Sequence, residues 1–216
     1  RDRSVSRGLG DVYKRQGATS AFFIILAVVI FCCVSGGSPE KVATKYADNM
    51  NNGNASKAIS YLAVDYEDCI NDALSDENVN EIVKQNGSGK EYTAKDYFAE
   101  IGTAFGNPSA KNSDDVYKAF LNSYSQQYKG NLKNFEIVDS TDISTDSDEV
   151  KSAVEGSQRL VKAFYTEKLD TTKYFNSSKV KKAVKLNVRY VKNEKVQNSV
   201  WIVVKMGTSW KILSVN

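Results

Sequence analysis

The chain has 216 residues, of which 41% are hydrophobic and 25% charged, a composition typical of a globular protein rather than of a collagenous or disordered one. It contains no histidine, which excludes a Ser-His-Asp triad, a histidine general base and any histidine metal ligand. Its three cysteines are too few for a disulfide framework, and its formal net charge is only +3.

The chain begins with a basic stretch that holds this whole excess of charge. Residues 1–16 contain five basic and two acidic side chains. Their sequence resembles the translated adapter found at the ends of some metagenomic reading frames, so we expect them to be non-native. The alternative is a genuine basic region in front of a signal sequence.

An uncharged segment follows, and its apolar centre runs from Ala21 to Val34. These 14 residues are fewer than the roughly 20 of a bilayer-spanning helix but fit the roughly 7–15 of a secretory signal. We therefore expect residues 17–37 to be a signal, lipoprotein or membrane-anchor segment with its tether, and the protein to be exported and anchored to the outer face of a bacterial cell membrane. Cleavage near Gly36, retention as an anchor and lipidation of Cys33 are all open; lipidation is the first choice, because the small residues after Cys33 resemble a lipoprotein tether.

Residues 38–216 are expected to form a single α+β domain in which helices come first. Ser38 followed by Pro39 predicts a helix start, and apolar residues at helical spacing continue to Met50 before the Asn-Asn-Gly of residues 51–53 ends the helix. Thr93 and Asp96 have the spacing of a capping box in a later helix. Further helices are predicted over residues 55–62 and 76–84, from Ala94 to Phe105, from Ser113 towards Gly130, and from Asp146 to Tyr165.

The hydrophobic period changes to that of strands towards the C-terminus. Phe135 and Ile137 predict one strand before the last helix. The last forty residues predict an antiparallel meander, because three alternating or apolar runs are joined by two short turns without an intervening proline. The runs cover residues 184–190, 199–206 and 210–215, and the fold class is α+β, with N-terminal helices packed on a C-terminal antiparallel sheet.

Two parts of this pattern resemble small exported lipoproteins of the nuclear transport factor 2-like superfamily, close to the ketosteroid-isomerase-like and cystatin-like folds. One is the amphipathic first helix with NNGNASKAISYL over residues 51–62, and the other is the meander ending in Trp210-Lys211-Ile212. The resemblance covers about a third of the chain and implies a curved sheet wrapped around a helix, with a conical pocket. It implies no particular activity, because that scaffold carries enzymes and non-enzymes alike.

We expect a non-catalytic role in ligand binding or in interaction with the cell envelope. In the implied cone, Tyr190, Trp201 and Trp210 are the candidate contacts of a small apolar or amphipathic ligand. The alternative is a cofactor-free isomerase or hydratase that pairs an aspartate with a tyrosine, although no such pair can be assigned by position. No metal or cofactor is expected, because residues 87–90 and 142–148 lack side chains that a phosphate loop and a calcium loop require.

Charge in the expected domain is divided along the chain. Residues 39–150 hold 20 acidic and 10 basic side chains, a net charge of −10. Residues 151–216 hold 4 acidic and 14 basic side chains, a net charge of +10. Lys185 and Arg189 are therefore candidates to meet anionic wall polymer, lipid headgroups or an acidic envelope protein. The alternative is an internal match of acidic helices with a basic sheet. Nucleic acid is not an expected partner, because no reader motif is present.

Overall fold

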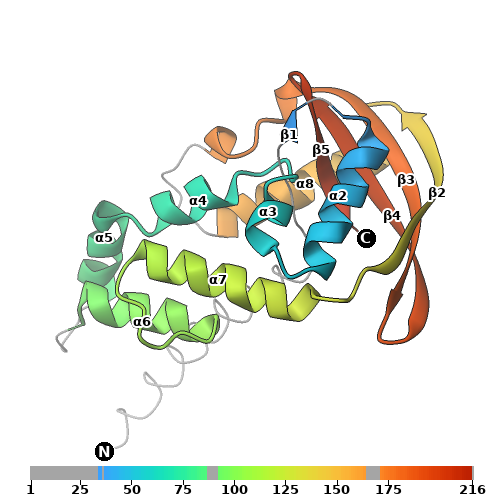
Figure 1. The fold of residues 1–216 in the computed structure, drawn as a ribbon. Coiled ribbons are helices and arrows are strands. Elements are labelled where there is room, and N and C mark those ends of the chain that lie inside the picture. Colours follow the sequence, from blue (N-terminus) through green and yellow to red (C-terminus); the bar gives the residue numbers. More distant parts are fainter. Residues whose placement is uncertain (1–33, 36, 87–91, 164–170, 216) are drawn as a thin grey trace, which may run out of the picture.

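The computed structural model describes residues 34–35, 37–86, 92–163 and 171–215. In this part of the chain, helices are followed by an antiparallel sheet, which confirms the α+β class (Figure 1). Residues 1–16, most of the predicted export segment and Cys33 lie outside the described residues. No described helix is both long enough and apolar enough to cross a bilayer.

The first helix, α2 (Pro39–Asn51), starts and ends where its sequence predicts. The side chain of Ser38 accepts a hydrogen bond from the Lys41 backbone amide and so satisfies one of the free N–H groups of the first turn. Gly53 follows the helix with a φ of 75°, a left-handed conformation that costs glycine little. The predicted apolar stripe does face the core, because its main members are all buried: Val42, Tyr46 and Met50.

Five more helices precede the main strands, and they form a helical layer beside α2 (Figure 1). The Thr93 and Asp96 capping box is present. Ser113 is the first helical residue of its helix rather than the cap, because the side chain of Asn112 takes the cap position and accepts the Asp115 amide hydrogen bond at 2.9 Å. The five are α3 (Ala55–Ile59), α4 (Tyr66–Ala73), α5 (Asp76–Asn86), α6 (Ala94–Ala104) and α7 (Ser113–Tyr128).

The described strands form one sheet in the order β1-β5-β4-β3-β2, and every neighbouring pair is antiparallel. The predicted meander is β3–β4–β5. Asn193 and Glu194 turn the chain between β3 and β4 with φ values of 49° and 63°, the paired positive values of a two-residue hairpin turn. The bounds are β1 (Val34–Ser35), β2 (Lys133–Ile143), β3 (Val180–Lys192), β4 (Lys195–Met206) and β5 (Ser209–Val215).

Helices cover both faces of the sheet. Tyr46 of α2 packs edge-on against Trp201 of β4, with 5.5 Å between ring centroids. The last helix, α8 (Asp148–Ala163), contacts Lys185, whose side chain points to the opposite face from that of its neighbour Leu186, the residue paired with Trp201. The core therefore has α2 on the Trp201 side and α8 behind (Figure 1).

The outer edge of β5 is covered by two segments from the N-terminal half of the chain. Val34 and Ser35 of β1 pair with Trp210 and Ser209. Next along β5, the amide of Ala63 donates to the carbonyl of Ile212, and the amide of Ile212 donates to Tyr61, both at 3.1 Å. These bonds fix the connection between α3 and α4 to the sheet, and this connection forms one wall of the pocket described below.

Candidate functional site

The three predicted aromatic contacts occupy different environments. Trp201 is fully buried against Tyr46 and Phe135, with ring centroids 5.5 and 4.9 Å away, and its indole N–H donates to the Ser199 hydroxyl at 3.1 Å. Trp210 is partly exposed, and the Lys205 ammonium lies 5.8 Å from its ring centroid.

Tyr190, also partly exposed, pairs across the strands with Gln197, so it is not opposite either tryptophan. Trp201 itself lies opposite Leu186 and Val215. The register therefore does not set these aromatic residues directly opposite one another, and none of them lines the pocket described below.

The two predicted partner-face residues, Lys185 and Arg189, each have an acidic neighbour in the chain. The Lys185 ammonium lies 3.2 Å from a carboxylate oxygen of Glu149, and the Arg189 guanidinium lies 3.4 Å from one of Glu136. Glu149 is at the start of α8, where its own backbone amide, and then Lys185, hold its pKa below the usual range. Glu136 lies beside Arg189 because β2 pairs with β3 in this register, and Glu149 lies beside Lys185 because α8 packs against the sheet.

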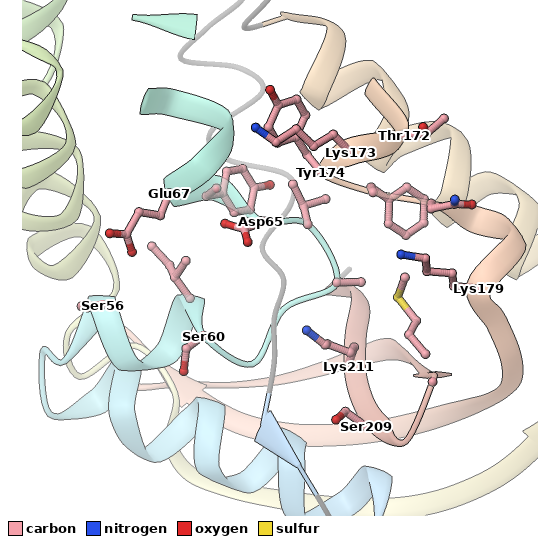
Figure 2. Close-up of a pocket in the computed structure, with 18 of the residues that line it drawn as sticks. Ser56, Ser60, Asp65, Glu67, Thr172, Lys173, Tyr174, Lys179, Ser209 and Lys211 are labelled. Carbon is pink, nitrogen blue, oxygen red and sulfur yellow. The ribbon is translucent and has the colours of Figure 1, made fainter. Parts of the chain in front are cut away.

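A pocket of about 530 Å³ lies at one end of the sheet, between three segments that are far apart in the chain (Figure 2). They are the α3–α4 region, the segment that carries the short helices η1 (Thr171–Lys173) and η2 (Ser177–Lys179), and the turn between β4 and β5. This volume is within the range of roughly 300–1,000 Å³ typical of small-molecule sites.

Direct bonds hold the first two of these segments together. The Asp65 amide donates to the carbonyl of Tyr174 at 3.0 Å. Behind this bond, Asp72 of α4 accepts a hydrogen bond from the Tyr174 hydroxyl at 2.6 Å and forms an ion pair with Lys173. The hydrogen bond from Lys173, and then that from Tyr174, lower the pKa of Asp72. The wall made by residues 172–176 is therefore tied to α4.

The pocket carries opposite charges on its two sides. Asp65 and Glu67, at the start of α4, supply carboxylates on one side, where Ser56 and Ser60 add hydroxyl groups (Figure 2). Lysines supply ammonium groups on the other sides. They are Lys179 and Lys211, whereas the ammonium group of Lys173 forms its ion pair with Asp72 of α4.

Lys211 is the most enclosed of these lysines, with only 8% of its surface exposed. It is a β5 residue, and Figure 2 shows its ammonium group directed into the pocket. Tyr66, Phe175 and Met206 contribute apolar surface to the same cavity. The arrangement suits a ligand that offers both an ammonium or hydroxyl group and an acidic group, with a small apolar part between them.

The described carboxylates with displaced pKa values all have a lowered pKa, and none of them lines the pocket. Hydrogen bonds lower the pKa of Glu40, Asp72, Asp96 and Glu149, in each case with a hydrogen bond as the largest cause. An isomerase that relies on an Asp–Tyr pair requires a carboxyl group with a raised pKa in its pocket. Among the residues that the structure describes, no group of three or more Cys, Asp or Glu side chains is placed to hold a metal ion.

No family model matches the chain, and neither a curated protein nor a solved structure is significantly similar to it. The pocket was not predicted from the sequence. Its walls come from residues 56–67, 172–179 and 206–211, together with Tyr117 of α7, and no short-range motif marks such distant segments as neighbours. The one local signal is Asp65, whose side chain caps α4 by accepting a hydrogen bond from the Asp68 amide at 3.1 Å.

Proposed function

We propose that this protein is an exported, membrane-tethered bacterial domain of nuclear transport factor 2-like architecture that binds a small ligand without catalysing a reaction. The apolar segment of residues 21–34 supports export and tethering. Helices packed on an antiparallel sheet support the architecture. The single observation that carries ligand binding is the pocket with carboxylates on one side and lysines on the other.

The ligand that complements these walls is zwitterionic, and a short peptide with free termini is the simplest case. Its ammonium group would lie near Asp65 and Glu67, and its carboxylate near Lys211. Lys211 contributes most to affinity, because an enclosed ammonium group interacts with a carboxylate more strongly than an exposed one does. This placement differs from that of the apolar or amphipathic ligand expected in the cone near Trp201.

The test is an NMR titration of the ¹⁵N-labelled full chain in detergent micelles. Zwitterionic alanyl-alanine is added to one sample, and the uncharged N-acetyl alanyl-alanine amide to another. We expect the amide signals of Ser60 and Gly207 to shift with the zwitterion and not with its neutral form. No shift up to about 20 mM, where even millimolar binding is visible, would exclude this ligand class.

Two variants sharpen the test. Lys211→Met keeps the length and apolar stem of the side chain but removes its charge, and we expect it to weaken binding of alanyl-alanine by about tenfold or more. Lys118→Met is the matched control, because Lys118 lies on α7 outside the pocket and pairs with Asp114 in an exposed i,i+4 ion pair. Equal affinity in the two variants would show that charge in the pocket does not bind the peptide.

A further inference from the structure

Four lysines near one end of the β3–β4 hairpin differ from Lys185 and Arg189 in having no acidic partner among the described residues: Lys179 just before β3, Lys181 and Lys182 at its beginning, and Lys205 at the end of β4. None of the four has an ion pair or hydrogen bond from its side chain to any residue that the structure describes. Strand pairing brings this region next to the β4–β5 turn, because Val180 pairs with Met206 and Lys182 with Lys205, and Lys205 in turn pairs with Trp210. We call this group the basic end: Lys179, Lys181, Lys182, Lys205 and Trp210.

The basic end brings like charges together. Lys182 and Lys205 are direct cross-strand partners, an arrangement that destabilises a sheet unless something neutralises it. Lys205 also approaches the Trp210 ring, at 5.8 Å from its centroid. A surface that carries negative charge and accepts an indole ring would relieve the repulsion and cover the tryptophan.

The chain that leads to the predicted membrane segment enters the domain at this same place. Val34 of β1 pairs with Trp210, and Ser35 pairs with Ser209. Any membrane attachment that precedes Val34 in the chain therefore joins the described domain beside the basic end.

The opposite side of the molecule has the opposite charge. Helix α5 contains three acidic residues and one lysine. Figure 1 shows α5 far from β1 and from the turn between β4 and β5. A negatively charged surface would therefore attract one end of this domain and repel the other.

We infer that the basic end is the face that the domain presents to the anionic phospholipid headgroups of its own membrane. This inference rests on the membrane tethering in the proposed function. Lys181, Lys182 and Lys205 lie among the headgroups, where each lysine contributes about fivefold to partitioning. Trp210 lies at the interface, the position that tryptophan favours in membrane proteins. The tether supplies attachment, and the basic end supplies orientation.

The test uses the full chain with vesicles of phosphatidylcholine alone or with about 30% phosphatidylglycerol, a fraction that gives the surface a negative potential. Quenching of tryptophan fluorescence by lipids with a nitroxide headgroup measures contact with the bilayer. Trp201 is fully buried, so the quenched residue is Trp210. We expect quenching to be about twofold or more stronger in anionic than in neutral vesicles, and this difference to vanish at about 1 M salt, where the screening length is about 3 Å.

A matched pair of variants locates the contact. Lys182→Glu with Lys205→Glu reverses the cross-strand pair at the basic end, and we expect it to abolish the extra quenching. Lys192→Glu with Lys195→Glu reverses the cross-strand pair at the other end of the same hairpin and makes the same change in net charge. About ten residues of strand, or roughly 33 Å, separate the two pairs. The second variant should therefore quench like the parent.

Flotation with neutral vesicles separates failure of this inference from failure of the proposed tethering. The orientation by the basic end would be overturned, and the tether left intact, by a chain that floats with neutral vesicles but shows the same quenching with and without anionic lipid. A chain that floats with neutral vesicles but loses quenching equally in both double variants would have the same meaning. A chain that does not float with neutral vesicles would overturn the tether and the inference with it.

Discussion

Two glycines inside helices, Gly102 of α6 and Gly156 of α8, are predicted to respond to alanine with opposite signs. A Cβ atom at Gly102 would lie 2.3 Å from the carbonyl oxygen of Asn107 and 2.5 Å from the Cβ of Ala110. At Gly156 the same atom would meet nothing within 4 Å. The backbone after α6 must therefore move to accept Gly102→Ala, whereas Gly156→Ala requires no movement.

The two effects can be weighed separately. Replacing glycine by alanine inside a helix stabilises it by about 0.5–1 kcal/mol, and this gain applies at both positions. Forcing an extra methyl group into a packed site costs about 1–3 kcal/mol, and this cost applies only at Gly102. We expect Gly102→Ala to lower the free energy of unfolding by about 1–2 kcal/mol and Gly156→Ala to raise it by about 0.5–1 kcal/mol.

Equilibrium unfolding in urea, followed by far-UV circular dichroism, measures both changes. The slope of free energy against urea should stay the same, so the midpoints alone report the stabilities. A Gly102→Ala variant as stable as the parent chain would refute this prediction, because the turn after α6 would then move at no cost. A Gly156→Ala variant less stable than the parent would refute it as well.

Further predictions concern buried phenols and the carboxylate behind the pocket. Tyr46→Phe removes the 3.0 Å hydrogen bond between the buried hydroxyls of Tyr46 and Tyr124, so we expect the free energy of unfolding to fall by about 1–2 kcal/mol. The double Tyr46→Phe/Tyr124→Phe variant should lose less than the sum of the two single changes, and additive losses in urea unfolding would contradict this. Burial raises the pKa of both tyrosines, so their stabilising effect is complete below the ordinary pKa of 10.0 and is lost as the pH rises above it; melting temperatures should therefore fall above pH 10, less steeply in the double variant. The pKa of Asp72 is lowered, so its stabilising effect is present above the ordinary pKa of 3.8 and is lost as the pH falls below it; Asp72→Asn should flatten acid unfolding between about pH 4 and 2, and an unchanged slope would refute this.

Features that depend on neighbouring residues were predictable from the sequence. The cap and stripe of α2, the capping box of α6 and the β3–β4–β5 meander all rest on signals within a few residues of one another. Helix α4 was not singled out, because it has only eight residues and its apolar positions do not extend over enough turns to mark a period. Short-range sequence signals thus predicted most of the main helices and strands but missed α4.

The site depends on distant segments, and this is why the sequence did not predict it. A charge imbalance between the two halves was visible, but only the register of β2 on β3 places Glu136 beside Arg189. Likewise, Lys211 reaches the side of the pocket opposite Asp65 only because residues 61–63 pair with β5. Trp201 was a candidate for ligand contact because it is aromatic, but a sequence does not reveal that Tyr46 and Phe135 pack around it.

Strand β1 also determines how the domain bears mechanical load. It is joined to β5 through only two residue pairs, Val34 with Trp210 and Ser35 with Ser209. A pull on the chain before Val34 acts on these two pairs before it reaches α2. The five residues from Val34 to the start of α2 could then span at most about 17 Å while the core keeps its packing. Under tension, the two β1–β5 residue pairs would therefore separate and the chain before α2 would straighten before the rest of the domain unfolds.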